Sequence, residues 1–223
     1  MSRLVPRPAV LLAAAGQAAV GIYIGRFGPT GPVPAHFGIN GQVDRWGDRT
    51  ETALVVGGMA LLTVLAGAAI GWSAERAEAD VARQRGLGVA QGVLIAATSG
   101  VTALQLALAT LGADGVIDPA RLSLLGLCVV FTLIGATVGK VAPNALVGVR
   151  TPWSLNSRLA WEKSNRLAGR LFFWGGLVGL FLAPFAPEPL GHQAAIGAVL
   201  LAAVACVFES WRVWRADPER RTV

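Results

Sequence analysis

The chain has 223 residues, of which 54% are hydrophobic and only 14% charged, whereas a soluble domain usually carries about 25% charge. Its net charge of +6 would suit a nucleic-acid-binding protein, but the basic residues lie between long apolar runs and do not form one patch. The composition therefore excludes an ordinary soluble domain and indicates an integral membrane protein, with no direct nucleic-acid binding.

Six runs of the sequence contain no Asp, Glu, Lys or Arg. A helix needs about 20 apolar residues, with a range of roughly 17–25, to cross the hydrocarbon core of a bilayer. Because the runs are apolar all round, we predict an all-α, polytopic membrane protein with six transmembrane helices. The predicted spans are Pro8–Gly25, Thr52–Trp72, Leu87–Leu111, Leu122–Gly139, Leu171–Pro187 and Gly191–Phe208.

The first run is interpreted as a retained helix. A cleaved signal peptide has a shorter apolar core and a small-residue cleavage site, and no Ala-x-Ala pair ends this run near Arg26. With six spans and a cytoplasmic N-terminus, fifteen of the 19 Lys and Arg residues lie inside and four outside. This bias agrees with the positive-inside rule, so both termini are expected in the cytoplasm. The charged tail after Trp211 is expected to fray.

The chain divides into two predicted units. Residues 1–72 form a two-span unit with an ordered outer loop at 26–51, and residues 73–223 form a four-span unit. Its first inner connection, 73–86, has a pattern typical of short helix extensions. Glycine pairs four residues apart, such as Gly135 with Gly139 and Gly175 with Gly179, favour a tightly packed bundle and are compatible with a homo-oligomer.

The outer loop follows the first span and is rich in Gly and Pro. Pro32 and Pro34 favour an extended run, and Asn40–Gly41 is a strong signal for a tight turn. Trp46 suits the membrane–water interface. We predict an ordered outward cap on the bundle, which binds a partner or serves only as an interfacial turn.

The loop also contains His36, Asp44 and Asp48, which would be conceivable metal ligands. A single His with two Asp in a polar loop is more often a hydrogen-bonded turn, so we predict no metal and no cofactor. The chain has no His-Glu-x-x-His and no Gly-x-Ser-x-Gly motif, and we predict that it is not an enzyme and has no catalytic residues.

The cores of the predicted spans lack ionisable residues, which argues against a proton-coupled transporter, a pump or a channel with a charged filter. Gln91 and Gln105 are about four helical turns apart and share a face with Thr98 and Thr102. Hydrogen bonding between helices is the favoured interpretation of these residues. A small-solute or lipid-handling transporter is the alternative.

The inner segment 140–170 is the longest connection and carries six Lys and Arg. Thr151–Pro152 is typical of an N-cap followed by proline at the first helical position, and Asn156 or Ser157 can cap a further helix to about Gly169. We predict that this second helix is amphipathic and interfacial, with Trp153 and Trp161 at the membrane face and Glu162 paired with Arg166. Membrane anchoring and docking of a soluble protein are equally compatible with this pattern.

The inner segment resembles the signature of the SdpI family of bacterial membrane proteins, in which an Asn precedes Gly-Ile-Arg-Thr-Pro-Trp-Thr-Leu, a Trp, a Lys-Thr-His-Arg-like stretch and Ala-Gly-Arg. The sequence departs from it at Ser154 and Asn165, where Thr and His are common. The matching candidate residues for partner binding are Asn144, Gly148, Arg150, Thr151, Pro152, Trp153, Trp161, Lys163, Asn165, Arg166 and Gly169.

The outer loop is similar to a short domain of unknown function that often precedes this family, with its Val-Pro-x-His-Phe, Gly and Asp. The family's named member protects bacteria against a secreted peptide toxin and holds a small autorepressor at the membrane. The resemblance thus implies a multi-pass protein of the bacterial cytoplasmic membrane, a toxin on its outer face and a small winged-helix repressor on its inner face. The implied toxin-facing residues are Pro34, His36, Phe37, Gly41, Asp44 and Trp46.

Overall fold

The computed structural model describes residues 5–76, 81–143 and 147–221. In these residues the helices are α1 (Arg7–Phe27), α2 (Arg49–Glu75), α3 (Val81–Ala107), α4 (Pro119–Val138), α5 (Pro152–Leu155), α6 (Arg158–Leu182) and α7 (Leu190–Ala216). A π-helical turn, η1 (Leu108–Gly112), continues α3 without a break. Strands β1 (Val33–Phe37) and β2 (Val43–Gly47) form a hairpin between α1 and α2.

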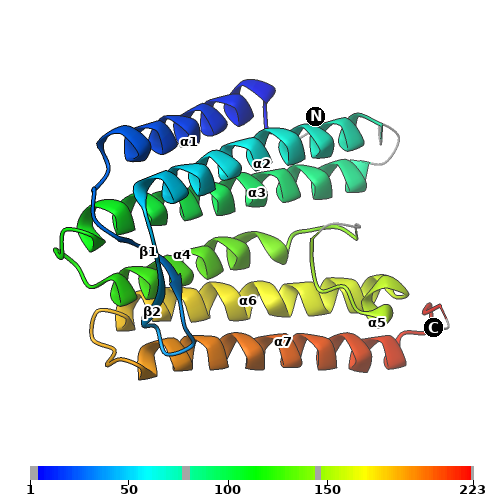
Figure 1. Cartoon of the computed structure of the whole chain (residues 1–223). Helices are drawn as coiled ribbons and strands as arrows, with labels where there is room; N and C mark the ends of the chain where they lie inside the picture. Colours follow the sequence, from blue (N-terminus) through cyan, green and yellow to red (C-terminus); the bar gives the residue numbers. More distant parts are fainter. Residues whose placement is uncertain (1–4, 77–80, 144–146, 222–223) are drawn as a thin grey trace.

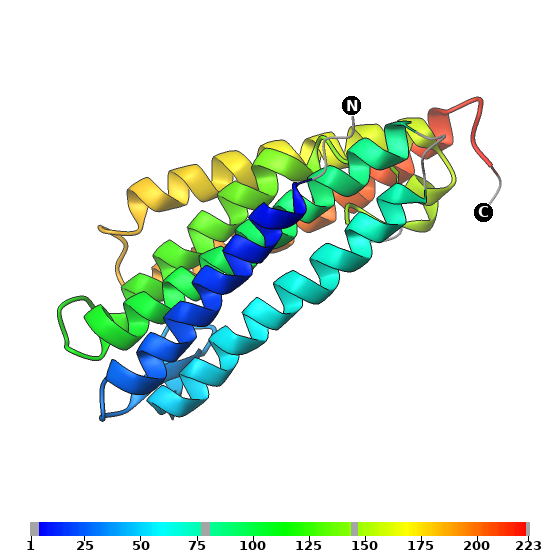
Figure 2. The same ribbon diagram turned by 90° about the horizontal axis from the view of Figure 1, so that it is seen from above.

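The helices form two groups of three. Helices α1, α2 and α3 pack together, α4, α6 and α7 pack together, and α3 against α4 joins the groups (Figure 1). Seen from above, the long helices run side by side along one direction (Figure 2). The boundary between the groups falls between α3 and α4. Helix α3 packs mainly on α2, and the division into units 1–72 and 73–223 stays a prediction.

Five helices of the described chain are long and apolar enough to cross a membrane: α1, α2, Gln84–Gly112, α4 and α7. They coincide with five of the six predicted runs. The remaining run, Leu171–Pro187, falls on α6, whose first half carries the basic inner segment. The protein is thus a mostly helical, multi-pass membrane protein with five candidate spans, and a sixth crossing by α6 stays a prediction.

Capping residues set where α2 and α4 begin. The carboxylate of Asp48 accepts hydrogen bonds from the backbone N–H groups of Thr50 and Glu51 at the start of α2. At the start of α4, the carboxylate of Asp118 accepts a hydrogen bond from the backbone N–H of Ala120, and Pro119 occupies the first helical position. These caps satisfy N–H groups that a helix start leaves without partners. Asp48 therefore has a structural use, which favours the hydrogen-bonded interpretation of the outer loop over a metal site.

Close backbone contact between α4 and α6 depends on glycine. A Cβ at Gly135 would overlap the backbone of Phe173, and one at Gly176 would lie 2.6 Å from the backbone nitrogen of Thr132. A Cβ at Gly169 would lie 3.1 Å from the backbone oxygen of Gly135 and 3.1 Å from the backbone nitrogen of Gly139, which is closer than ordinary contact. The predicted close approach at the Gly135–Gly139 pair is confirmed, and it fixes α6 along the length of α4.

Buried polar side chains link the first three helices. Gln17 of α1 donates to Thr98 of α3 at 3.1 Å, and its amide oxygen accepts from Thr63 of α2 at 2.9 Å. Gln91 donates to the carbonyl of Gly67 at 3.0 Å. These bonds between helices support the packing interpretation of the intramembrane polar residues over a substrate path.

The outer loop is a hairpin that reaches across the end of the bundle. Val33 packs in a core with residues of α1, α2 and η1, and β1 also contacts α4. At the tip, Gly41 has φ +76° and lies directly against the ring of His192 near the start of α7. The hairpin therefore ties the first helical group to the second, which fits the predicted ordered cap (Figure 1).

Two local predictions are wrong. The inner amphipathic helix and the fifth apolar run form one continuous helix, α6, because no residue breaks it after Gly169 and α4 packs along both halves. The segment after Trp211 is not frayed at its start: α7 continues to Ala216, and the backbone N–H of Arg221 donates to the carbonyl of Asn156.

Candidate functional site

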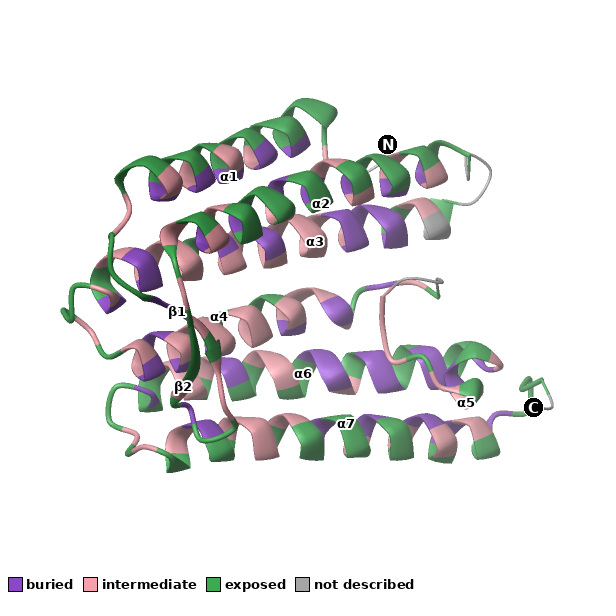
Figure 3. Cartoon of the chain, in the orientation of Figure 1, coloured by how far each residue is buried: buried purple, intermediate pink, exposed green. Residues whose placement is uncertain are grey.

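The signature segment lies at one end of the bundle, the end at which α1 begins and α7 ends (Figure 1). The hairpin lies towards the opposite end. After α4 the chain turns through residues 147–150, forms the single turn α5, and enters α6. The buried residues of α6 concentrate in its first half, next to α5 (Figure 3). Much of the signature therefore faces inward.

Asn165 is the central hydrogen-bonding residue of this segment. Its side chain is 1% exposed; the amide oxygen accepts from the backbone N–H of Val149 at 2.7 Å, and the amide nitrogen donates to the carbonyl of Trp161 at 3.0 Å. Gly148 has φ +128°, and a Cβ there would lie 2.6 Å from the Asn165 oxygen. Gly148 thus provides both the backbone conformation and the space that this contact needs.

Trp161 lies in the interior and not at the membrane face where it was predicted. Its side chain is fully buried, and the indole N–H donates to the carbonyl of Val141 at 2.9 Å. A buried indole contributes a large apolar area and requires a partner for its N–H. Trp161 therefore holds the chain that leaves α4 against α6. Trp153, by contrast, is partly exposed.

Thr151 and Ser154 form a capping box around α5. The Thr151 side chain accepts from the Ser154 backbone at 3.1 Å, and the Thr151 backbone donates to the Ser154 hydroxyl at 2.9 Å. Ser154 donates in turn to the carbonyl of Val149 at 2.6 Å, and Thr151 lies 2.8 Å from the hydroxyl of Ser210 on α7. The predicted Thr-Pro helix start is confirmed, and it also docks α5 on α7.

The end of α7 is bonded to the start of α6. Ser157 caps α6 by accepting from Ala160 and donates its hydroxyl proton to the carboxylate of Asp217. That bond, with smaller help from the backbone N–H of Glu219 and the charge of Arg220, lowers the pKa of Asp217 below its ordinary value. Asp217 is therefore ionised and bonded throughout the neutral range.

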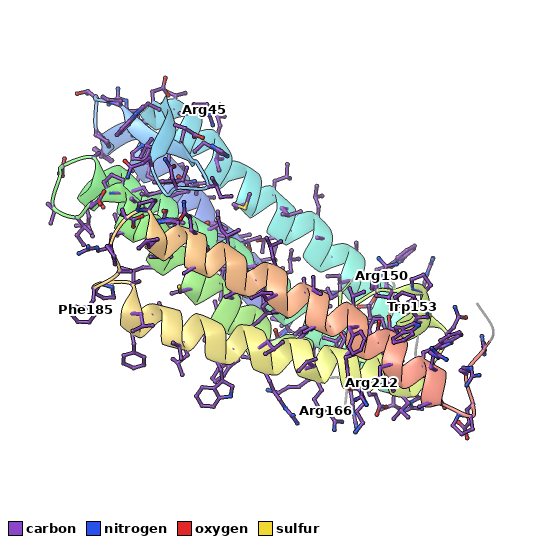
Figure 4. The ribbon with its side chains drawn as sticks, turned by 90° about the horizontal axis from the view of Figure 1, so that it is seen from below. Arg45, Arg150, Trp153, Arg166, Phe185 and Arg212 are labelled. Atoms are coloured by element: carbon purple, nitrogen blue, oxygen red, sulfur yellow. The ribbon has the colours of Figure 1, made fainter. Side chains whose placement is uncertain are left out.

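The exposed part of the signature is mainly basic. Arg150, Lys163 and Arg166 are exposed, and their side chains have no hydrogen bond or ion pair with any other described residue. Pro152 is also exposed. Glu162 pairs with Arg158, at 3.3 Å, and not with Arg166 as predicted. Figure 4 places Arg150, Trp153 and Arg166 at the same end of the bundle. Asn144 lies outside the described residues.

Residues 140–210 match the model of the SdpI/YfhL protein family. This segment belongs to the SdpI/YfhL family. The match contains α5, α6 and most of α7, which is the assembly just described. It does not reach the outer loop, so the similarity of that loop to an N-terminal domain stays a prediction. No curated protein and no solved structure matches the chain.

The two departures from the SdpI/YfhL signature keep the hydrogen bonds intact. Ser154 stands where Thr is common, and its hydroxyl both accepts and donates within the capping box. Asn165 stands where His is common, and it supplies the acceptor for the Val149 N–H. A threonine hydroxyl and a neutral imidazole offer the same functions. The structure therefore explains why these replacements are mild.

The outer-loop candidates divide into buried and exposed residues. Pro34 and Gly41 are buried and shape the hairpin, and Phe37 is partly buried. His36, Asp44 and Trp46 are exposed, and the imidazole Nδ1 of His36 lies 2.6 Å from the carboxylate of Asp44. The exposed residues and the partly buried Phe37 present the surface that a partner could contact, and the buried Pro34 and Gly41 hold the hairpin in shape.

A buried cluster beside the hairpin tip was not predicted. His192 is 5% exposed; its Nε2 lies 2.9 Å from the hydroxyl of Ser123 and its Nδ1 lies 3.0 Å from the carboxylate of Glu188. The cluster joins α4, α7 and the turn before α7, directly under Gly41. The four-residue spacing of Glu188 and His192 was the one sequence signal available, and it gives no sign of Ser123.

Proposed function

We propose that the protein is a non-enzymatic immunity factor of the bacterial cytoplasmic membrane, which protects the cell against a secreted, membrane-active peptide toxin. The SdpI/YfhL match over residues 140–210 carries this proposal. The outer hairpin supports it, because His36, Asp44 and Trp46 are exposed on an element packed against both helical groups. A rigidly held surface recognises a partner with less loss of conformational entropy than a flexible loop.

The inner surface is proposed to hold a small winged-helix repressor. Arg150 follows the bonded Val149 directly and precedes the capping box, so its backbone is fixed while its guanidinium is exposed. An exposed Arg without an internal partner is suited to bind a carboxylate on a soluble protein. The buried signature residues hold this platform in shape, and Arg150 and Trp153 make the contact.

Expression in a toxin-sensitive bacterial strain tests the immunity role. Survival under toxin challenge should rise when the chain is present in the membrane. Unchanged killing by every related peptide, at a verified membrane level of the protein, would refute the proposal.

The Arg150→Ala variant separates the two roles. It should keep protection and lose retention of the repressor at the membrane. Arg158→Ala is the matched control, since Arg158 is also exposed but is paired with Glu162. Equal repressor retention in the Arg150 variant and in the unmodified protein would remove Arg150 from the proposed contact.

A further inference from the structure

A basic hollow lies between α6 and α7 at the inner end of the bundle. Its volume is about 290 Å³, and its lining residues are Lys163, Arg166, Leu167, Arg170 and Glu209. The three cations lie one turn apart along α6 and are all exposed. They give the hollow a concentrated positive charge at the depth where α6 changes from a polar to an apolar sequence.

The single acidic residue of the hollow does not neutralise these cations. The carboxylate of Glu209 is held by two hydrogen bonds from Arg212, at 2.9 and 3.0 Å. Lys163, Arg166 and Arg170 have no acidic partner among the described residues. Figure 4 shows Arg166 and Arg212 at the same end of the bundle, at the α6–α7 pair. The positive charge of Lys163, Arg166 and Arg170 is therefore not neutralised by a carboxylate of the described residues.

An apolar groove lies further along the same pair of helices. Its volume is about 450 Å³, and it begins at Leu171, the residue after Arg170. Small side chains of α7 line it, among them Ala195, Ala198 and Ala202. Because Glu209 lies seven residues after Ala202, the groove and the hollow share one face of α7.

We propose that this hollow and groove bind one anionic phospholipid of the inner leaflet. The phosphate contacts Lys163, Arg166 and Arg170, and an acyl chain lies in the groove from Leu171 towards the membrane centre. Charge complementarity selects this occupant: basic pockets between membrane helices on the cytoplasmic side bind anionic headgroups. A second copy of the chain is a poorer match to this positive charge, since its own net charge is +6. The leaflet follows from the orientation that the charge bias indicates.

In this proposal the exposed basic residues of the signature have two different binding partners. Lys163 and Arg166 contact the lipid, and Arg150 stays available for a soluble partner. The bound lipid would fix α6 at the membrane surface while α4 fixes its apolar half.

The test measures lipid binding to the purified full chain in a neutral detergent, by native mass spectrometry. The probes are dioleoyl phosphatidylglycerol, dioleoyl phosphatidylcholine with the same chains, and inorganic phosphate. Phosphatidylglycerol should bind preferentially. The double variant Arg166→Gln/Arg170→Gln should bind it about thirtyfold more weakly, since each basic residue near an anionic lipid contributes about fivefold. Arg158→Gln, at a residue of α6 that does not line the hollow, should bind as the unmodified protein does.

A second pair of variants tests the groove. Ala198→Phe should fill it and weaken phosphatidylglycerol binding, whereas Ala203→Phe, exposed on α7 outside the groove, should not. Equal binding of both phospholipids would overturn the proposal. If inorganic phosphate displaced phosphatidylglycerol at a similar concentration, the site would bind phosphate and not a lipid, which would also overturn the proposal. If the double variant lost a soluble protein partner and kept its lipid, the cations would belong to a protein interface. These outcomes are independent of toxin protection.

Discussion

Replacing Asn165 tests whether the signature is an internal structural element. The Asn165→Ala variant removes the acceptor for the Val149 N–H at 2.7 Å and the donor to the Trp161 carbonyl at 3.0 Å. An unsatisfied buried donor costs about 1–3 kcal/mol, and the second lost bond about 1 kcal/mol more. The free energy of unfolding should therefore fall by about 2–4 kcal/mol.

The assay is thermal unfolding of the detergent-solubilised protein, with two matched variants. Ser164 is equally buried, but its hydroxyl donates only to carbonyls of the preceding helical turn. The Ser164→Ala variant should therefore lose less than about 0.5 kcal/mol of unfolding free energy. Asn165→His, with the residue common in the family, should retain most of the stability, because a ring nitrogen can accept the Val149 N–H. A midpoint for Asn165→Ala equal to that of Ser164→Ala would refute the reasoning.

Three further predictions concern other contacts. Gly41→Ala should destabilise the protein more than Gly115→Ala: both residues have positive φ, which costs alanine about 1–2 kcal/mol, but only the first faces a buried ring. An equal fall in the unfolding midpoint of both variants would contradict the contact between Gly41 and His192. Gly135→Ala should lower the midpoint strongly because it meets backbone of α6, and Gly175→Ala, with open space around it, should not; similar midpoints would contradict this packing. Asp217→Asn should increase proteolysis of the C-terminal tail at neutral pH. In the unmodified protein, protection of the tail should be lost only as the pH falls through the lowered pKa of the Asp217 carboxylate, since the stability that such a group contributes is present above its unfolded pKa. A tail equally protected at neutral pH in both proteins would refute this prediction.

Five of the helices could be predicted from sequence because each apolar run is uninterrupted and flanked by charge or caps. The start of α5 was equally predictable, since Thr151 and Pro152 determine it locally. The outer loop was predicted as an extended run followed by a tight turn. The pairing of β1 with β2 became visible only in the structure. Local chemistry thus determines element positions in this chain.

The interior of the signature could not be predicted because its partners are remote in sequence. Trp161 and Asn165 look like surface residues of an amphipathic helix until Val141 and Val149 are placed against them. The continuity of α6 was missed for a similar reason. The change to an apolar sequence after Gly169 resembles a boundary, but α6 runs unbroken from Arg158 to Leu182 and packs on α4 on both sides of this point.

The cluster around His192 shows the same limit more sharply. Its partner Ser123 is 69 positions away, and the contact with Gly41 spans both helical groups. A lone histidine at the start of an apolar run carries no signal of either contact. Charge counting, in contrast, gave an orientation that does not depend on packing.

Both proposals place the signature segment at the cytoplasmic face, and thiol labelling of intact cells tests this most directly. Asp44→Cys on the hairpin and Arg158→Cys on α6 introduce exposed thiols, and the native Cys128 and Cys206 are buried. A membrane-impermeant maleimide should label position 44 in intact cells and position 158 only after permeabilisation, with the unmodified protein unlabelled. Labelling of position 158 in intact cells would contradict the account.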